Sequence, residues 1–370
     1  MVAWYYFSDS HMNKILDRLF GKEAPEQSFE YGEMREQTGF TIAYTPREDD
    51  TITIAAVGKG EPLEISFPRA GRDEAHILYM EVTELLRSRA KLGQDAPAIR
   101  RAVEALFGVF RGQRPPPEAS APHTPSHTAS GEFVPNPGKS LAIDVDGTTY
   151  VRLPIKTRLI TTRDTDILPL IDEYVRPHLA AGDTIYVSEK ALTITQGRVV
   201  DMSTVKPTRL ARFLARNVGN YYGSEEFHGF GHGTDLAMQL FIEEAGYPRI
   251  LFAAAVSALT RPLGIRGLFY FICGKRAKSI DCPMSFLILE YAHSVKLAPN
   301  DPSGAAKRIK KLLGREVVIL DANYRGAFSL GKSTHAITES FIGKLFRDNP
   351  LGQSDEMTPF CIVRRAPSVA

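Results

Sequence analysis

The sequence predicts a mixed α/β protein with two domains, the smaller of them α+β. Short β-rich runs alternate with apolar patterns of helical period along the 370 residues. A stretch rich in Pro, Ser and Thr, residues 112–140, interrupts this alternation. Such a stretch buries too little apolar surface to offset its ordering entropy, so we expect a flexible linker. The expected domains are 1–111 and 141–350, followed by a tail, 351–370.

The N-terminal domain is expected to combine a β-meander with helices. β-rich runs at 38–44, 51–57 and 63–67 are separated by turn residues. Leucine, isoleucine and valine recur at helical spacing over 73–90 and 95–110. No catalytic constellation is visible in this part, so we expect an accessory or dimerisation domain of unknown role.

The C-terminal domain is expected to alternate strands and helices. Asp146-Gly147 lies between two β-rich runs and predicts a hairpin. The expected strands are 141–145, 150–154, 184–188, 249–254, 267–273 and 316–320, and the expected helices are 167–179, 235–245, 303–313 and 334–346.

Composition limits the partners and the compartment. The net charge of +2 gives no electrostatic reason to expect nucleic acid or an acidic membrane as the main partner. Cys273, Cys282 and Cys361 are too few and too widely spaced to predict a disulfide framework or a zinc site. The N-terminal residues lack the basic and apolar regions of a secretory signal, so we expect a soluble, cytoplasmic protein.

Two aspartates at strand ends are the strongest functional signal. Asp281 follows Ser279-Ile280, and Asp321 follows the apolar run Val318-Ile319-Leu320. Carboxylates delivered from adjacent strand ends can hold a hard divalent cation, which often bridges substrate phosphates. The pattern therefore predicts a site for Mg²⁺ or Mn²⁺, although aspartates also occur at strand ends as turn formers.

Three other patterns suggest different chemistry. Asp144 and Asp146 match the aspartate motif of haloacid-dehalogenase-like phosphatases, but a second β-rich run follows where that fold needs a helix. Residues 326–333 fit the P-loop pattern G-x-x-x-x-G-K-S, but Asp321 to Arg325 separate that glycine from the preceding strand. His228 and His232, in a glycine-rich run, are weak candidates for metal ligands.

Several runs together resemble one family, the coenzyme F-420-0:L-glutamate (gamma-glutamyl) ligases, over roughly residues 141–333. The matching runs, in chain order, are Arg152 to Thr157 with Asp164 and Asp166, Gly182 to Lys190, Thr195 to Arg198, Asp281, Leu297 to Pro302, and Asp321. The chain departs from the family where Cys282-Pro283-Met284 follows the first aspartate and Ala322-Asn323-Tyr324 follows the second. It therefore looks like a divergent branch, in which the acceptor cannot be assigned.

The resemblance implies a gamma-glutamyl-ligase-like C-terminal domain and a role for each matching residue. Asp281, Asp321 and Lys190 would be catalytic, and Asp281 and Asp321 would hold the metal; Asn323, where the chain departs from the family, is added as a metal ligand because its amide oxygen suits the same cation. The residues that would bind GTP or ATP are Thr157, Arg158, Ser188, Lys190 and Arg198. The resemblance also implies a homodimer.

The expected activity is an amide ligase that joins an amino acid, most simply L-glutamate, to a small-molecule carboxylate through an acyl phosphate. Metal held by the aspartates would neutralise the phosphate charge during transfer, and Lys190 and Arg198 would contact phosphates or a carboxylate. The alternative is a non-catalytic, ligand-sensing module that has kept the ligase fold.

Overall fold

The computed structural model describes residues 38–47, 49–58, 60–68, 71–91, 95–113, 133–217, 234–260, 267–284, 288–323, 326–352 and 356–366. The chain forms two compact units, and each unit is described separately below. The first comprises Met1–Ala121, Asp201–Tyr247 and Ile280–Val295, and the second comprises Pro122–Val200, Pro248–Ser279 and Lys296–Ala370. The units are therefore not continuous in sequence, in contrast to the expected single boundary at 112–140.

The first unit contains the predicted meander and its two helices. Strands β1 (Thr41–Pro46), β2 (Thr51–Val57) and β3 (Leu63–Pro68) form an antiparallel sheet in the order β1-β2-β3. Helices α3 (Arg72–Lys91) and α4 (Ala96–Phe110) share one apolar core with this sheet. The Asp95 carboxylate caps α4 by accepting from the Ala98 N–H, which fixes where the helix begins.

The other regular elements that the structure describes in the first unit are mainly helical. They include the 3₁₀ turns η4 (Met202–Thr204) and η8 (Leu289–Tyr291) and the helices α7 (Arg209–Asn217) and α8 (Asp235–Ala245). Helix α8 confirms the prediction for 235–245. It begins where the Thr234 hydroxyl accepts from the Ala237 N–H. Two short strands, β7 (Val199–Asp201) and β8 (Ser294–Lys296), pair with each other where the chain changes unit.

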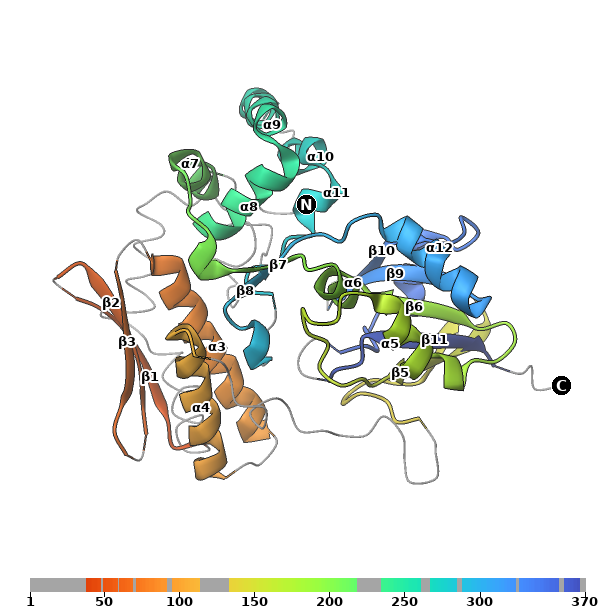
Figure 1. Ribbon diagram of the computed structural model, residues 1–370, viewed down its shortest axis with the longest axis horizontal. Coiled ribbons are helices and arrows are strands. Elements are labelled where there is room, and N and C mark those ends of the chain that lie inside the picture. The colour runs from red at the N-terminus through yellow and green to blue at the C-terminus, as the bar shows by residue number, and fades with distance from the viewer. Residues whose placement is uncertain are drawn as a thin grey trace. The chain divides into compact units, whose positions relative to one another are not determined.

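The second unit is built on a six-stranded mixed sheet in the order β10-β9-β6-β11-β5-β4. Figure 1 labels the first five of these strands. The strands are β4 (Ala142–Val145), β5 (Thr148–Ile155), β6 (Thr184–Ser188), β9 (Glu316–Asn323), β10 (Gly326–Lys332) and β11 (Phe360–Arg365). Strands β6 and β9 pair in parallel, and the other neighbours pair antiparallel. Asp146 and Gly147 both have positive φ between β4 and β5, which confirms the predicted hairpin.

Helices cover both faces of this sheet. Helix α13 (Glu339–Leu345) packs with Val318 and Leu320 of β9 on one face. Helix α12 (Pro302–Leu313) packs on β9 and β10 and also contacts α5 (Ile167–Tyr174). Helix α6 (Glu189–Thr195) contacts β6 and β9, and the 3₁₀ turn η3 (Arg176–His178) follows α5. These elements confirm a mixed α/β fold.

Two predicted strands are helical instead. Residues 249–254 lie within α9 (Tyr247–Thr260), and residues 268–273 form α10, which is followed by α11 (Lys275–Lys278). A short apolar run has no periodicity that separates a buried strand from a helix. The alanine-rich continuation of the first run favours a helix. Among the described residues, no helix has both the length and the apolar composition to cross a bilayer.

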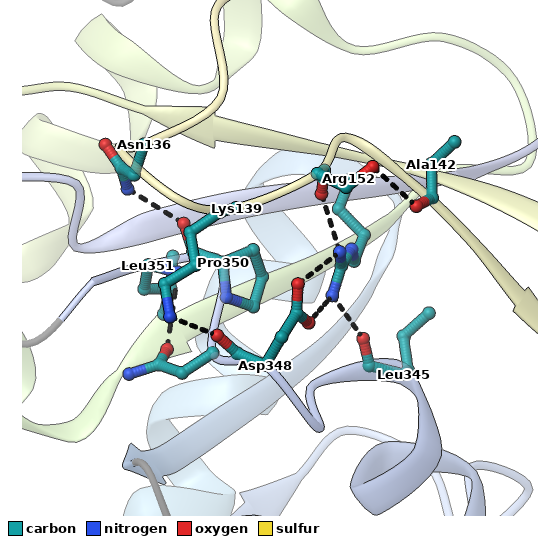
Figure 2. A network of polar contacts seen from close by, with 10 residues as sticks. Asn136, Lys139, Ala142, Arg152, Leu345, Asp348, Pro350 and Leu351 are labelled. Carbon is teal, nitrogen blue, oxygen red and sulfur yellow. Dashed lines mark hydrogen bonds and ion pairs between the residues drawn. The ribbon is translucent and has the colours of Figure 1, made fainter.

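Two other segments differ from their predictions. The expected tail contains β11, which lies between β5 and β6 and pairs with both. The end of the expected linker is ordered: the Asn136 amide donates to the Pro350 carbonyl over 2.8 Å, and the Lys139 ammonium donates to the Asp348 carbonyl over 2.6 Å (Figure 2). Residues 114–132 of that linker lie outside the described ranges.

Candidate functional site

The carboxyl ends of β6 and β9 bring several predicted site residues to one edge of the sheet. In the parallel register Ser188 lies opposite Leu320, so Lys190 and Asp321 each follow just beyond the paired residues. Asn323 ends β9 and lies two positions beyond Asp321, so the two side chains project from the same face of that strand. In open, mostly parallel α/β sheets ligands usually bind at the carboxyl ends of the strands, and here β6 and β9 form the parallel pair of a mixed sheet.

The antiparallel strands of the unit add Thr157 to the same edge. Strand β5 ends at Ile155 opposite Phe360, which in turn pairs with Val187 near the end of β6. Thr157 is buried; its N–H donates to the Met357 carbonyl over 2.9 Å, and its hydroxyl donates to the Arg158 carbonyl over 2.8 Å. These bonds hold the loop after β5 against the segment that leads into β11.

A fully buried ion pair lies directly behind this edge. Glu189, the first residue of α6, is 3% exposed, and its carboxylate pairs with the ammonium of Lys296, which is 0% exposed. Burying two charges is costly, and the cost is recovered only when the charges stay paired. Neither residue was predicted from the sequence to belong to the site.

Both arginines predicted to contact phosphate make internal bonds. The Arg158 guanidinium forms a two-pronged pair with Asp164, over 2.5 and 2.9 Å, and the hydrogen bond from Arg158 lowers the pKa of Asp164. The Arg198 Nε donates to the Ala298 carbonyl over 2.5 Å, and the Arg198 carbonyl accepts from the Leu297 N–H. These contacts hold the loops around the carboxyl ends of β6 and β9 in place. They also occupy some of the arginine N–H groups that were predicted to donate to phosphate.

The other predicted metal ligand is in a different unit. Asp281 belongs to the first unit, between the buried side chains of Ile280 and Cys282, whereas Asp321 and Asn323 belong to the second. Within the described ranges, no group of three or more His, Cys, Asp or Glu side chains has a geometry that could hold a metal ion. His228 and His232 lie outside those ranges.

The structure also bears on the two competing motifs. Residues 326–332 form strand β10 rather than a phosphate-binding loop, and the Lys332 ammonium donates to the Ile337 carbonyl over 2.7 Å. Asp144 accepts a hydrogen bond from the Thr149 hydroxyl across the β4–β5 hairpin, at 2.5 Å. A second strand thus follows the aspartate motif, where the phosphatase fold needs a helix.

A polar pocket of about 380 Å³ lies at the β4 side of the second unit. Its lining includes Arg152, which is 1% exposed, and Asp348. The Arg152 guanidinium pairs with the Asp348 carboxylate and also donates to the carbonyls of Leu345 and Ser140, over 2.9 and 2.6 Å (Figure 2). Because these bonds tie the residues before β4 to the turn after α13, we interpret the network as structural.

Comparisons with known proteins do not place the chain in a family. No protein-family model and no curated protein matches it. The functional interpretation therefore depends on the residues at the β6–β9 edge.

Proposed function

We propose that the second unit is the nucleotide- and metal-binding part of an amide ligase. The reaction would join an amino acid, most simply glutamate, to a small carboxylate through an acyl phosphate. The observation that carries the proposal is the parallel register of β6 and β9, in which Ser188 is opposite Leu320 and Lys190 and Asp321 follow at the same edge. The Lys190 ammonium can pair with a phosphate oxygen, and the side-chain oxygens of Asp321 and Asn323 can bind a divalent cation. Together these groups suit a nucleoside triphosphate and its metal ion.

The donor set at the end of β9 fits Mg²⁺ or Mn²⁺. Asp321 offers a carboxylate and Asn323 an amide oxygen from the same face of the strand. Mg²⁺ commonly takes one or two carboxylates from the protein and keeps water and substrate phosphates as its other ligands. When bound, the metal would supply charge neutralisation for phosphoryl transfer. This proposal is confined to residues of the second unit, so it assigns no role to Asp281.

The chain's own residues would orient the substrates. Lys190, in the first turn of α6, would hold a phosphate oxygen, and its position is fixed because Glu189 next to it is anchored by Lys296. Thr157, held by its bonds to the neighbouring loop, would border the nucleotide. Arg158 and Arg198 would act by shaping loops.

A ligand-sensing module is the second candidate. The internal bonds of Arg158 and Arg198 favour it, because a ligase needs free cationic groups for the transferred phosphate. The two functions differ in turnover. A ligase releases phosphate only when amino acid and acceptor are both present, whereas a sensing module binds its ligand without releasing phosphate.

The proposal is tested by thermal unfolding of the full chain with GTP or ATP, each with and without Mg²⁺ or Mn²⁺. A ligand at about 100 times its Kd stabilises by about 2.7 kcal/mol, which raises the Tm of a unit of about 150–250 residues by roughly 5–11 °C. We expect a metal-dependent rise for one nucleotide. Asp321→Asn should abolish the rise without lowering the Tm of the ligand-free protein by more than a few degrees.

Asp146→Asn is the matched control, because Asp146 is a carboxylate of the same unit in the β4–β5 turn, at the opposite end of β5 from the candidate site. It should keep the full nucleotide response. A response that survives in Asp321→Asn as well would show that the metal site is wrongly assigned. No response to either nucleotide would refute the nucleotide-binding function.

A further inference from the structure

Helix α9 carries apolar side chains on its exposed side, whereas a surface helix normally exposes polar or charged side chains. Ile250 and Ala253 are buried on one side of the helix. The exposed apolar positions beyond the first turn are Leu251 (54% exposed), Phe252 (61%), Leu259 (74%), Ala255 and Ala258. At 3.6 residues per turn these positions lie on one side, where a surface helix normally carries charged or polar groups.

The next helix continues this pattern. In α10, Phe271 is 78% exposed, the largest exposed fraction among the large apolar side chains that the structure describes. An ordinary protein surface exposes large apolar side chains singly and scattered. Several of them within one short stretch of chain indicate an interaction site.

The charged side chains of this stretch are all basic. Between residues 245 and 280 the sequence contains no Asp or Glu, and its basic residues are Arg249, Arg261, Arg266, Lys275, Arg276 and Lys278. Arg249, in the first turn of α9, and Arg276, in α11, are exposed. The expectation of no membrane partner came from the net charge of +2 for the whole chain, and that average conceals this local excess.

We propose that α9 and α10 bind the surface of an anionic lipid bilayer. Exposed Leu and Phe side chains would enter the boundary between head groups and acyl chains, and the flanking basic residues would attract anionic head groups. Helix α9 has 14 residues and is therefore about 21 Å long, which suits a helix lying in the interface rather than one that crosses about 30 Å of hydrocarbon.

Charge favours a bilayer over a second copy of the chain. A dimer through α9 would bring two basic stretches together without any acidic residue between 245 and 280 to pair with them. Like charges brought together across an interface are unfavourable, whereas an anionic membrane supplies the opposite charge. The inference does not depend on the proposed ligase function.

The test is sedimentation of the full-length protein with vesicles of phosphatidylcholine alone or mixed with phosphatidylglycerol. We expect binding to the mixed vesicles that weakens as salt is raised, and little binding to phosphatidylcholine alone. The double variant Leu251→Ser/Phe252→Ser should bind at least about tenfold more weakly. Phe328→Ser, which removes an exposed aromatic of β10 (41% exposed), should bind as the parent does.

Circular dichroism and light scattering accompany each variant, so that misfolding and self-association are detected. Phe271→Ser supplies an independent test if the α9 variant does not fold. Failure to sediment with anionic vesicles, or unchanged binding by both folded variants, would overturn the proposal. A dimer that becomes monomeric in the α9 variant would overturn it in favour of a second copy.

Discussion

Lys296→Met tests the buried pair behind the candidate site. Lys296 is 0% exposed and Glu189 is 3% exposed, so water does not screen either charge. Removing one partner leaves the other charge buried and unpaired, which typically costs about 3–5 kcal/mol. For a unit of this size that lowers Tm by roughly 6–20 °C. Differential scanning calorimetry of the full chain gives this shift and resolves two transitions if the units unfold separately.

The double variant Glu189→Leu/Lys296→Met completes the cycle. Replacing both charges by apolar groups of similar size is often neutral or stabilising, so most of the lost stability should return. Lys310→Met is the matched control. Its ammonium pairs with Glu316 over 2.5 Å, but both side chains are more than a third exposed, so its loss should cost less than about 1 kcal/mol. Equal costs for Lys296→Met and Lys310→Met, or additive single substitutions at 189 and 296, would refute the reasoning.

Two further predictions concern the packing and the pH dependence of the units. Burial, the largest cause, and the charge of nearby Asp235 together raise the pKa of Asp73 to about 6. Because the pKa of this acid is higher in the folded state, the stability that Asp73 contributes should fall as pH rises from about 4 to 6 and then level off, by about 2–3 kcal/mol. Asp73→Asn should lack this decline in urea unfolding series, and parallel curves for parent and variant would contradict the assignment. Gly331→Ala should destabilise by about 1–3 kcal/mol, because its Cβ would lie 2.3 Å from the backbone of Pro302 in α12. Gly343→Ala in α13, whose Cβ would meet the Ala327 carbonyl oxygen at an ordinary contact distance of 3.8 Å, should stabilise slightly; similar effects for both would show that α12 shifts at little cost.

Local signals predicted much of the fold. The meander and helices of the first unit follow from alternation and helical period, and Asp146-Gly147 specifies the β4–β5 hairpin through its own conformational preference. Prediction failed where the decisive information is not local. The apolar run at 268–273 is a helix bounded by Gly267 and Gly274, both with positive φ, and its composition alone suits a strand equally well.

The candidate site also combines features that the local sequence predicts with features that it does not. The acidic residue after the apolar run Val318-Ile319-Leu320 drew attention to Asp321, but the predicted strand end was wrong by three residues, because β9 continues to Asn323. Glu189 and Lys296 are 107 positions apart in the chain, and the sequence around either residue does not predict that they pair. The internal bonds of Arg158 and Arg198 were likewise invisible, because an arginine in a loop has the same sequence signature whether it binds a ligand or a backbone carbonyl.

The position of β11 has a consequence for synthesis of the protein. Residues 360–365 lie between β5 and β6, so these two strands have no direct pairing with each other in the finished sheet. A nascent chain that has not yet released β11 from the ribosome carries two unpaired strand edges in the middle of its future sheet. The second unit must therefore complete its fold after translation of β11. Until then the unpaired edges of β5 and β6 can bind chaperones or aggregate.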